Sequence, residues 1–142
     1  MFAGLKSTYS ALVNSLQEVF RERTRMINVP SVTSYTGDLS DTKKVADFDL
    51  GKGRWVVFAK ASATAYGGNL GRADLRLKVL GKEGDVTKSD ESYESASPSL
   101  GASMTVILPF DVISTAHFEV NVASQIGMAA FKHIVVTAIR EA

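Results

Sequence analysis

The stretch that most constrains the fold is residues 54–66, whose side chains divide into two faces at a period of two. Side chains of a β-strand point alternately to opposite faces of a sheet. One face of this stretch is apolar throughout. The other face is apolar in the first half of the stretch and carries both polar and apolar side chains in the second half. We therefore expect a long central strand of a β-sandwich, with Trp55 as its largest core side chain. The apolar face consists of Trp55, Val57, Ala59, Ala61, Ala63 and Ala65.

Similar alternation predicts further strands along the chain. Residues 73–80 place apolar side chains at every second position, with charged ones between, so they are the natural hairpin partner of residues 54–66. The near-continuous apolar run in residues 131–140 predicts burial on both faces. Pro109 is expected to end a strand. The expected strands are residues 45–50, 54–66, 73–80, 102–110, 115–124 and 131–140, with two weaker ones elsewhere.

The N-terminal region has the pattern of a helix. Apolar residues recur in residues 1–27 at alternating spacings of three and four, interrupted only by Arg23. Such a seam is typical of a coiled coil, and extra apolar positions on one flank favour three chains over two. Packing on its own domain and docking on another protein are the alternatives. The predicted helix interface consists of Phe2, Leu5, Tyr9, Leu12, Leu16, Val19 and Met26.

Together these patterns predict an all-β fold, a jelly-roll-type β-sandwich of about eight antiparallel strands, preceded by one long N-terminal α-helix. The helical segment, residues 1–29, would serve trimerisation or anchoring, and it ends before Pro30 because the residue before a proline avoids the helical conformation. Residues 30–44 are rich in Ser, Thr and Asp and are expected to form an extended linker or a weak first strand. The β-sandwich domain is predicted over residues 45–142.

Composition excludes several classes of site. The net charge of +1 offers no field for nucleic acid or an anionic membrane. The absence of cysteine excludes disulfides, thiolate zinc sites and a cysteine nucleophile. No apolar run approaches the roughly 18 residues of a membrane span, and the N-terminus is a poor signal peptide. We therefore expect an intracellular product, or one released by lysis, without nucleic-acid binding or membrane insertion.

No catalytic constellation stands out in the sequence. The two histidines, His117 and His133, do not have the spacing of an HxH or HExxH motif, and GxSxG is absent. Asp47 and Asp49 share one face of a predicted strand, but two outward carboxylates without further ligands are usually solubilising. We therefore expect no enzyme activity, no catalytic residue, no cofactor and no metal site.

Two polar stretches are expected to lie between strands. Residues 67–72 predict a turn, and residues 81–101, rich in serine and carboxylates, predict a solvated loop with at most short edge-strand segments. Tyr66 lies beside the first stretch and Tyr93 lies within the second. Each could stack on a sugar ring, so these tyrosines mark possible ligand loops.

Two segments resemble a known class of protein. Residues 49–61, DLGKGRWVVFAKA, resemble the opening of small jelly-roll modules in bacteriophage virions, where a leucine, a glycine turn, an aromatic residue and an apolar-Ala-Lys strand recur. Residues 132–140, KHIVVTAIR, are similar to the last strand of the same modules. Those modules are similar in shape to the trimeric heads of tumour necrosis factor and C1q, and usually top fibres, spikes or decorations. The resemblance implies a virion protein and carries over no functional residue.

The expected function is that of a non-enzymatic structural phage protein, a trimeric fibre, spike or decoration component of the head or tail. Its helix would anchor it to a capsid or tail protein of the virion, after synthesis in the host cytoplasm. The alternative is a carbohydrate- or receptor-binding module on a virion or cell surface, with a host-surface glycan as ligand. Interchain contacts are expected where a lone sandwich would need polar side chains. These residues are Val56, Phe58, Phe131, Val135 and Ile139.

Overall fold

The computed structural model describes residues 24–37, 42–65, 73–126 and 128–141, and every regular element in these ranges is a β-strand. The strands pair antiparallel throughout, which confirms the prediction of an all-β fold. In order along the chain they are β1 (Thr24–Val29), β2 (Tyr35–Gly37), β3 (Lys43–Ala65), β4 (Ala73–Glu83), β5 (Val86–Ala96), β6 (Ala102–Ile126) and β7 (Ala129–Glu141).

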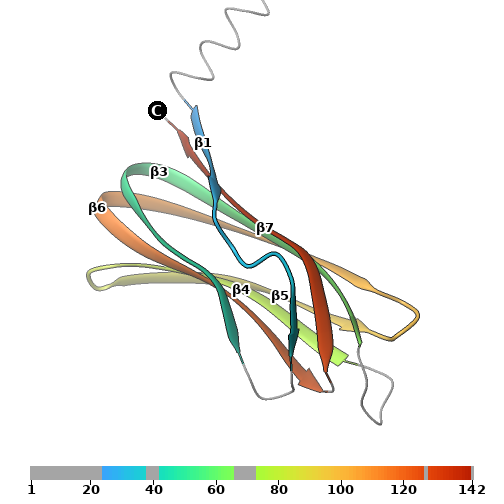
Figure 1. Cartoon of the computed structure of the whole chain (residues 1–142). Coiled ribbons are helices and arrows are strands. Elements are labelled where there is room, and N and C mark those ends of the chain that lie inside the picture. The colour runs from blue at the N-terminus through green and yellow to red at the C-terminus, as the bar shows by residue number, and fades with distance from the viewer. Residues whose placement is uncertain (1–23, 38–41, 66–72, 127, 142) are drawn as a thin grey trace, which may run out of the picture.

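The strands form one hydrogen-bonded sheet in the order β1-β7-β3-β6-β4-β5, with β2 also paired to β7. This sheet folds into two layers because β3 and β6, which pair over most of their length, bend back on themselves together (Figure 1). The second half of β3 pairs with β7, whereas the second half of β6 pairs with β4. Strands that change layer at bulges are a known way of building the corner of a sandwich.

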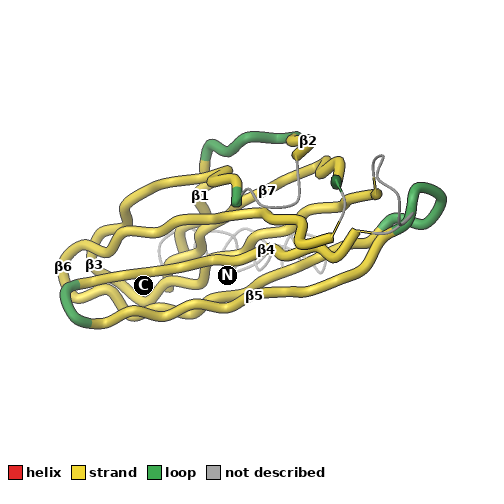
Figure 2. The backbone as a smooth tube through the Cα atoms, turned by 90° about the horizontal axis from the view of Figure 1, so that it is seen from below, coloured by secondary structure: helices red, strands yellow, loops and turns green. Residues whose placement is uncertain are grey.

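We name the layers by the strands that belong to only one of them. The β7 sheet contains β1, β2, β7, the second half of β3 and the first half of β6. The β4 sheet contains β4, β5, the first half of β3 and the second half of β6. Figure 2 shows β4 and β5 on one side of the molecule and β1, β2 and β7 on the other.

The corner is built at a register shift between Gly51 and Gly53 of β3, where β6 carries one extra residue. Gly53 has a φ of 150°, and a Cβ atom there would lie 2.6 Å from Cδ of Arg140. On the β6 side, the carboxylate of Glu83 accepts hydrogen bonds from the backbone N–H groups of Ile113 and Ser114, each at 2.8 Å. Glu83 therefore satisfies amide groups at the point where the bulge interrupts the ladder.

The core lies between the two layers and consists mainly of alanine, valine and leucine side chains, together with three buried phenylalanines. Phe110 and Phe118 of β6 meet edge to face, with ring centroids 5.3 Å apart, and Phe118 stacks on Phe48 at 5.5 Å. Trp55 is only 4% exposed, and its Nε1–H donates a hydrogen bond to the carbonyl oxygen of Gly51 at 2.8 Å. The prediction of a long central strand with Trp55 in the core is therefore confirmed.

The predicted helix is wrong where the structure describes it, because residues 24–29 form strand β1 and pair with β7 from Thr24↔Glu141 to Val29↔Val136. Backbone pairing with β7 overrides the local 3.5-residue periodicity there. Six of the seven predicted helix-interface residues precede this strand and lie outside the described residues. The remaining one, Met26, lies on β1.

For part of residues 30–44 the alternative of a weak strand is confirmed. Tyr35–Gly37 forms strand β2 on β7, and β3 begins at Lys43. The segment before β3 is fixed further by a backbone hydrogen bond from Val32 N–H to the carbonyl oxygen of Val45, at 2.8 Å. The residues expected to connect a helix to the sandwich therefore include strand β2 of the β7 sheet and the first residues of β3.

Two predicted interruptions do not occur. Residues 45–50 and 54–65 belong to the single strand β3, and Pro109 lies inside β6. The first half of β6 is the open edge of the β7 sheet, so a proline there breaks no ladder on its free side.

The predicted polar loop of residues 81–101 is largely strand β5, which pairs with β4 from Ala73↔Ala96 to Glu83↔Val86. Its polar and charged side chains are almost all exposed, as is common for edge strands, which avoid pairing with other chains. The composition that predicted a loop therefore belongs to an edge strand.

Candidate functional site

The outer surface of the β7 sheet carries a contiguous set of apolar side chains. Directly paired residues of antiparallel strands point to the same face. Met26, Ile139 and Val56 are paired in succession across β1, β7 and β3, and Val56 is paired with Pro109 on β6. One whole row across these four strands is therefore apolar on the outside of the sheet.

The neighbouring rows extend this surface. Phe58 is paired with Ile107 on one side and with Thr137 on the other, and Val135 is paired with Lys60. Met26 is 69% exposed, Ile107 47% and Val135 45%. We call this surface the apolar face; it consists of Met26, Val56, Phe58, Ile107, Pro109, Val135 and Ile139.

A charged row borders the apolar face at the end near the C-terminus. Arg54 lies 3.6 Å from Asp111 and 3.9 Å from Glu141, measured between the guanidinium nitrogens and the carboxylate oxygens. These three side chains, with Val56, Pro109 and Ile139, line a groove of about 470 Å³. An apolar centre with a charged rim is the usual anatomy of a protein–protein interface.

Four of the five residues predicted for interchain contact lie on the apolar face: Val56, Phe58, Val135 and Ile139. Phe131 does not lie there, and its prediction as a surface residue is wrong, because it is 1% exposed and packs in the core. The cause is a bulge: Lys60 is paired with Val135 and Ser62 with Lys132, so β7 has one extra residue between them. His133, within this bulge, has a φ of 55°. Residues on either side of a bulge change face relative to simple alternation.

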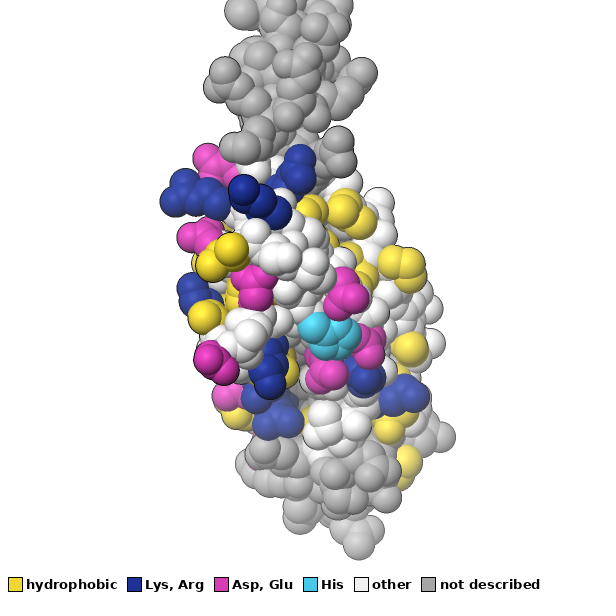
Figure 3. All heavy atoms as spheres, turned by 90° about the vertical axis from the view of Figure 1, so that its left-hand side faces the viewer, with side chains coloured by type: hydrophobic (Ala, Val, Ile, Leu, Met, Phe, Trp, Pro, Cys, Tyr) yellow, Lys and Arg dark blue, Asp and Glu magenta, His cyan; other side chains and the backbone are white. Residues whose placement is uncertain are grey.

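The outer surface of the β4 sheet carries a cluster of charged groups around His117. Nδ1 of His117 lies 2.7 Å from Oδ1 of Asp49, and Nε2 lies 2.6 Å from Oδ1 of Asp47 and 3.8 Å from Oε1 of Glu119. Nζ of Lys44 lies 2.8 Å from Oδ2 of Asp47 and 3.7 Å from Oε1 of Glu119. Figure 3 shows a histidine side chain (cyan) surrounded by acidic ones (magenta).

These contacts shift the acid–base equilibria of the cluster. The hydrogen bond to Asp49 raises the pKa of His117 above its usual value, with help from the negative charges of Asp47, Asp49 and Glu119. The hydrogen bond from Lys44 lowers the pKa of Asp47, and the same bond raises the pKa of Lys44. In the absence of other cations, the cluster therefore favours the protonated imidazole.

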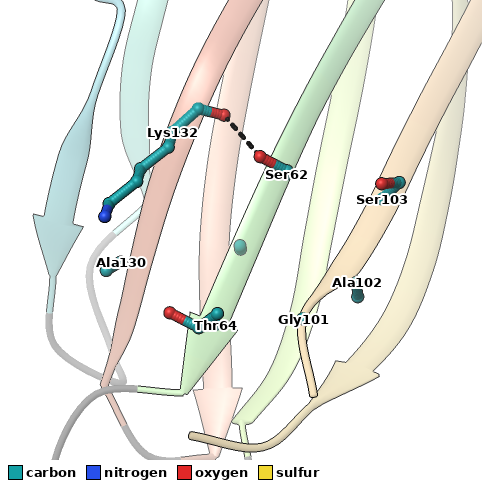
Figure 4. Close-up of a pocket in the computed structure, with 8 residues that line it drawn as sticks. Ser62, Thr64, Gly101, Ala102, Ser103, Ala130 and Lys132 are labelled. Carbon is teal, nitrogen blue, oxygen red and sulfur yellow. Dashed lines mark hydrogen bonds between the residues drawn. The ribbon is translucent and has the colours of Figure 1, made fainter. Parts of the chain in front are cut away.

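A pocket of about 370 Å³ lies at the other end of the β7 sheet (Figure 4). Its polar groups are hydroxyls and one ammonium, and Ser62 donates a hydrogen bond to the carbonyl oxygen of Lys132 at 3.2 Å. Among the described residues that line it, none carries a carboxylate or an imidazole. The lining residues are Ser62, Ala63, Thr64, Gly101, Ala102, Ser103, Ala130 and Lys132.

Of the two tyrosines that mark possible ligand loops, the structure describes one. Tyr66 lies outside the described residues. Tyr93 is 56% exposed, and it lies on strand β5 opposite Arg76 instead of in a loop. Exposed aromatic rings can stack on sugars, so Tyr93 keeps a chemistry suited to the alternative function.

Sequence reasoning missed two sets of surface residues. Ile107 and Pro109 lie between inward-facing residues of a predicted strand. Their outward direction could therefore be predicted from the alternation of side chains along that strand. The contact between His117 and Asp49 could not be predicted from the sequence, because it depends on the register between β3 and β6. That register joins residues 68 positions apart in the chain.

Neither a family model nor a curated protein matches the sequence. Within the part of the chain that the structure describes, no helix is long and apolar enough to cross a membrane. Solved structures with a similar fold do exist. A chain of the infectious bursal disease virus Gt strain is similar with a TM-score of 0.60 and 11% identity, over 84% of this chain and 34% of that one.

Two more solved structures share the fold. The CBM22-1 xylan-binding domain of Xyn10C from Paenibacillus barcinonensis has a TM-score of 0.53 and 12% identity, over 84% of this chain and 83% of that one. The D431N mutant of infectious bursal disease virus VP2, in T=1 particles, has a TM-score of 0.50 and 11% identity, over 84% and 36%. The chain thus spans about a third of the viral chains and most of the xylan-binding domain. At such identities the likeness shows the fold alone, and it agrees with the predicted jelly-roll-type sandwich.

Proposed function

We propose that the protein is a non-enzymatic structural component of a virus particle that assembles as a homotrimer through its apolar face. The observation that carries this proposal is the apolar row Met26–Ile139–Val56–Pro109 on the outside of the β7 sheet. Scattered apolar residues are normal on a surface, but a contiguous apolar set is typical of an interaction site.

The energetics favour covering this surface. Met26, Ile107 and Val135 keep about half or more of their surface exposed. Burying the exposed part of each such side chain is worth on the order of 1 kcal/mol. Because the strands carrying the apolar face are held by backbone pairing on a rigid sheet, little conformational entropy is lost when a partner docks.

Further copies of the same chain are the partner that fits best. The apolar seam predicted for residues 1–27 runs into β1, the strand that contributes Met26 to the apolar face. A three-stranded coil of these segments would bring three β1 strands together, with the apolar faces turned towards a common axis. The charged row of Arg54, Asp111 and Glu141 contains both signs, so it can form ion pairs between identical copies at the rim.

Two observations support a position of this trimer on a virion. Residues 49–61 and 132–140 resemble jelly-roll modules of phage fibres, spikes and decorations. The fold is also similar to that of the VP2 protein in infectious bursal disease virus particles. We infer a fibre, spike or decoration component of the head or tail. It is made in the host cytoplasm and joined to a capsid or tail protein through its N-terminal segment.

Light scattering after size exclusion tests the trimer on the full chain. We expect a mass three times the 15.3 kDa of one chain. A monomer across the accessible concentration range would overturn the proposal. A dimer would also contradict it, since a three-fold arrangement of apolar faces would then be wrong.

The second candidate function is carbohydrate binding, favoured by the likeness to the xylan-binding domain, 83% of which this chain covers. Exposed Tyr93 is the described aromatic residue that we expect to stack on a sugar. Glycan-array binding that is lost in Tyr93→Ala would support this function, and binding unaffected by that change would exclude Tyr93 as its site. An appendage that binds glycans on the host surface would combine both functions.

A further inference from the structure

The cluster around His117 has a donor set suited to a metal ion. Asp49 is paired with His117 and Asp47 with Glu119 across β3 and β6, so the four side chains emerge on the same outer face of the β4 sheet. One imidazole nitrogen and one carboxylate oxygen each from Asp47 and Glu119 lie within 4.8 Å of one another. At these residues β6 is paired on both sides, with β3 and with β4, and the ladder between β3 and β6 holds the side chains at fixed spacing.

The orientation of the imidazole ring is set by Asp49. Oδ1 of Asp49 accepts a hydrogen bond from Nδ1–H of His117 at 2.7 Å. This contact directs Nε2 towards Asp47 and Glu119, at 2.6 and 3.8 Å. A carboxylate that accepts from one ring nitrogen and leaves the other free to bind is the usual partner of a metal-binding histidine.

We infer that Nε2 of His117 and the carboxylates of Asp47 and Glu119 bind a divalent transition-metal ion of the zinc class, with Asp49 as a positioning residue. Metal–ligand bonds of about 2.0–2.2 Å in tetrahedral geometry place ligand atoms roughly 3.3 Å apart. The distances of 2.6 and 3.8 Å from Nε2 to the two carboxylates lie on either side of this spacing. Small rotations of two half-exposed side chains are therefore enough to accommodate an ion.

The chemistry of the donors selects among ions. An imidazole with two carboxylates suits zinc and its neighbours in the first transition row, with water completing the coordination. Calcium prefers six to eight oxygen ligands, which this set does not offer. Magnesium also prefers oxygen ligands and retains several waters, so both ions serve as negative controls.

Lys44 acts as an internal competitor for the same carboxylates. Its ammonium contacts Asp47 at 2.8 Å and Glu119 at 3.7 Å. A bound metal ion and this ammonium would repel each other at such short range. Removing the ammonium in Lys44→Ala should therefore tighten metal binding, an effect that a merely structural role of Lys44 would not produce.

Isothermal titration of the full chain with zinc chloride in a metal-free buffer tests the site. We expect one zinc ion per chain in the wild type, and binding at least tenfold weaker in His117→Asn and in Asp47→Asn. Asp49→Asn should weaken binding tenfold or more while the ligands themselves are kept. His133→Asn is the matched control, because His133 is the only other histidine and its φ of 55° is one that asparagine tolerates.

The titration results either support or overturn the metal site. Zinc affinity that falls in His117→Asn and is unchanged in His133→Asn supports the site, provided that circular dichroism shows an intact fold in both variants. Equal zinc affinity in His117→Asn and the wild type would overturn it. Calcium binding as tight as zinc binding would overturn it too, since the carboxylates alone would then be the ligands. Undetectable zinc binding to the wild type would have the same consequence.

Discussion

Val56 of β3 and Ile139 of β7 face each other as a cross-strand pair on the outer surface of the β7 sheet. On one side this pair continues to Met26 of β1, and on the other to Pro109 of β6. A sheet whose outer face met only water would place polar side chains at these positions. The pair therefore marks the surface on which the proposed assembly depends.

Trp55→Ala should destabilise the fold by about 3–5 kcal/mol, because it empties a large core position. The wild-type ring is 4% exposed, donates a hydrogen bond to Gly51 and lies under the guanidinium of Arg140 at 5.9 Å. Urea denaturation followed by circular dichroism measures the change. The matched control is Tyr93→Ala, an exposed aromatic that should cost less than about 1 kcal/mol. Equal losses in both variants would show that Trp55 is not part of the core.

Gly81→Ala should cost about 1–3 kcal/mol through overpacking. A Cβ atom at Gly81 would lie 2.6 Å from Cε1 of Phe118 and 2.9 Å from Cδ2 of Phe110, so the two rings would have to move. Gly51→Ala is the control, since no atom lies within 4 Å of its added Cβ. Thermal melts of both variants measure the difference, and a Gly51→Ala variant as unstable as Gly81→Ala would contradict the close contact with the rings.

Glu83 should make stability depend on pH in the acid range. Hydrogen bonds from the N–H groups of Ile113 and Ser114 lower the pKa of this carboxyl in the folded state. A lowered folded pKa means that the stabilisation is complete above the unfolded value of about 4.3 and is lost as pH falls through the folded pKa. Glu83→Gln should therefore destabilise the protein at neutral pH, with the difference from the wild type shrinking at acid pH.

Urea titrations at several pH values follow this dependence. Glu94→Gln, at an exposed position on β5, serves as the control and should keep the wild-type profile. A constant gap between Glu83→Gln and the wild type from pH 7 to pH 3 would contradict the role of the carboxylate charge at the bulge.

Much of the fold follows from local alternation of side chains. The period of two in residues 54–66 predicted the central strand and the burial of Trp55. The same reasoning predicted outward apolar positions at Val56, Phe58, Val135 and Ile139, all of which lie on one surface. Alternation is a property of the nearest neighbours in the chain, so a single sequence is enough to read it.

The remaining features depend on pairing between distant segments. The extra residue of β7 near His133 turns Phe131 into the core, although Phe131 and Val135 would share a face in a regular strand. Residues 24–27 fit a helical seam, but they pair with the last residues of the chain. His117 meets Asp47 and Asp49 only through the register of β3 and β6. None of these pairings leaves a local signal in the sequence.

The central claim is that the apolar face is buried between copies of the chain, and Phe58→Asp tests it most directly. Phe58 lies between Ile107 and Thr137 on this face, so a buried carboxylate there would repel its counterparts and lose hydration. Tyr93→Asp, on β5 of the other sheet, is the matched control. Light scattering at equal concentrations should give three chain masses for the wild type and Tyr93→Asp, and one for a folded Phe58→Asp. A stable trimer in Phe58→Asp would contradict the account.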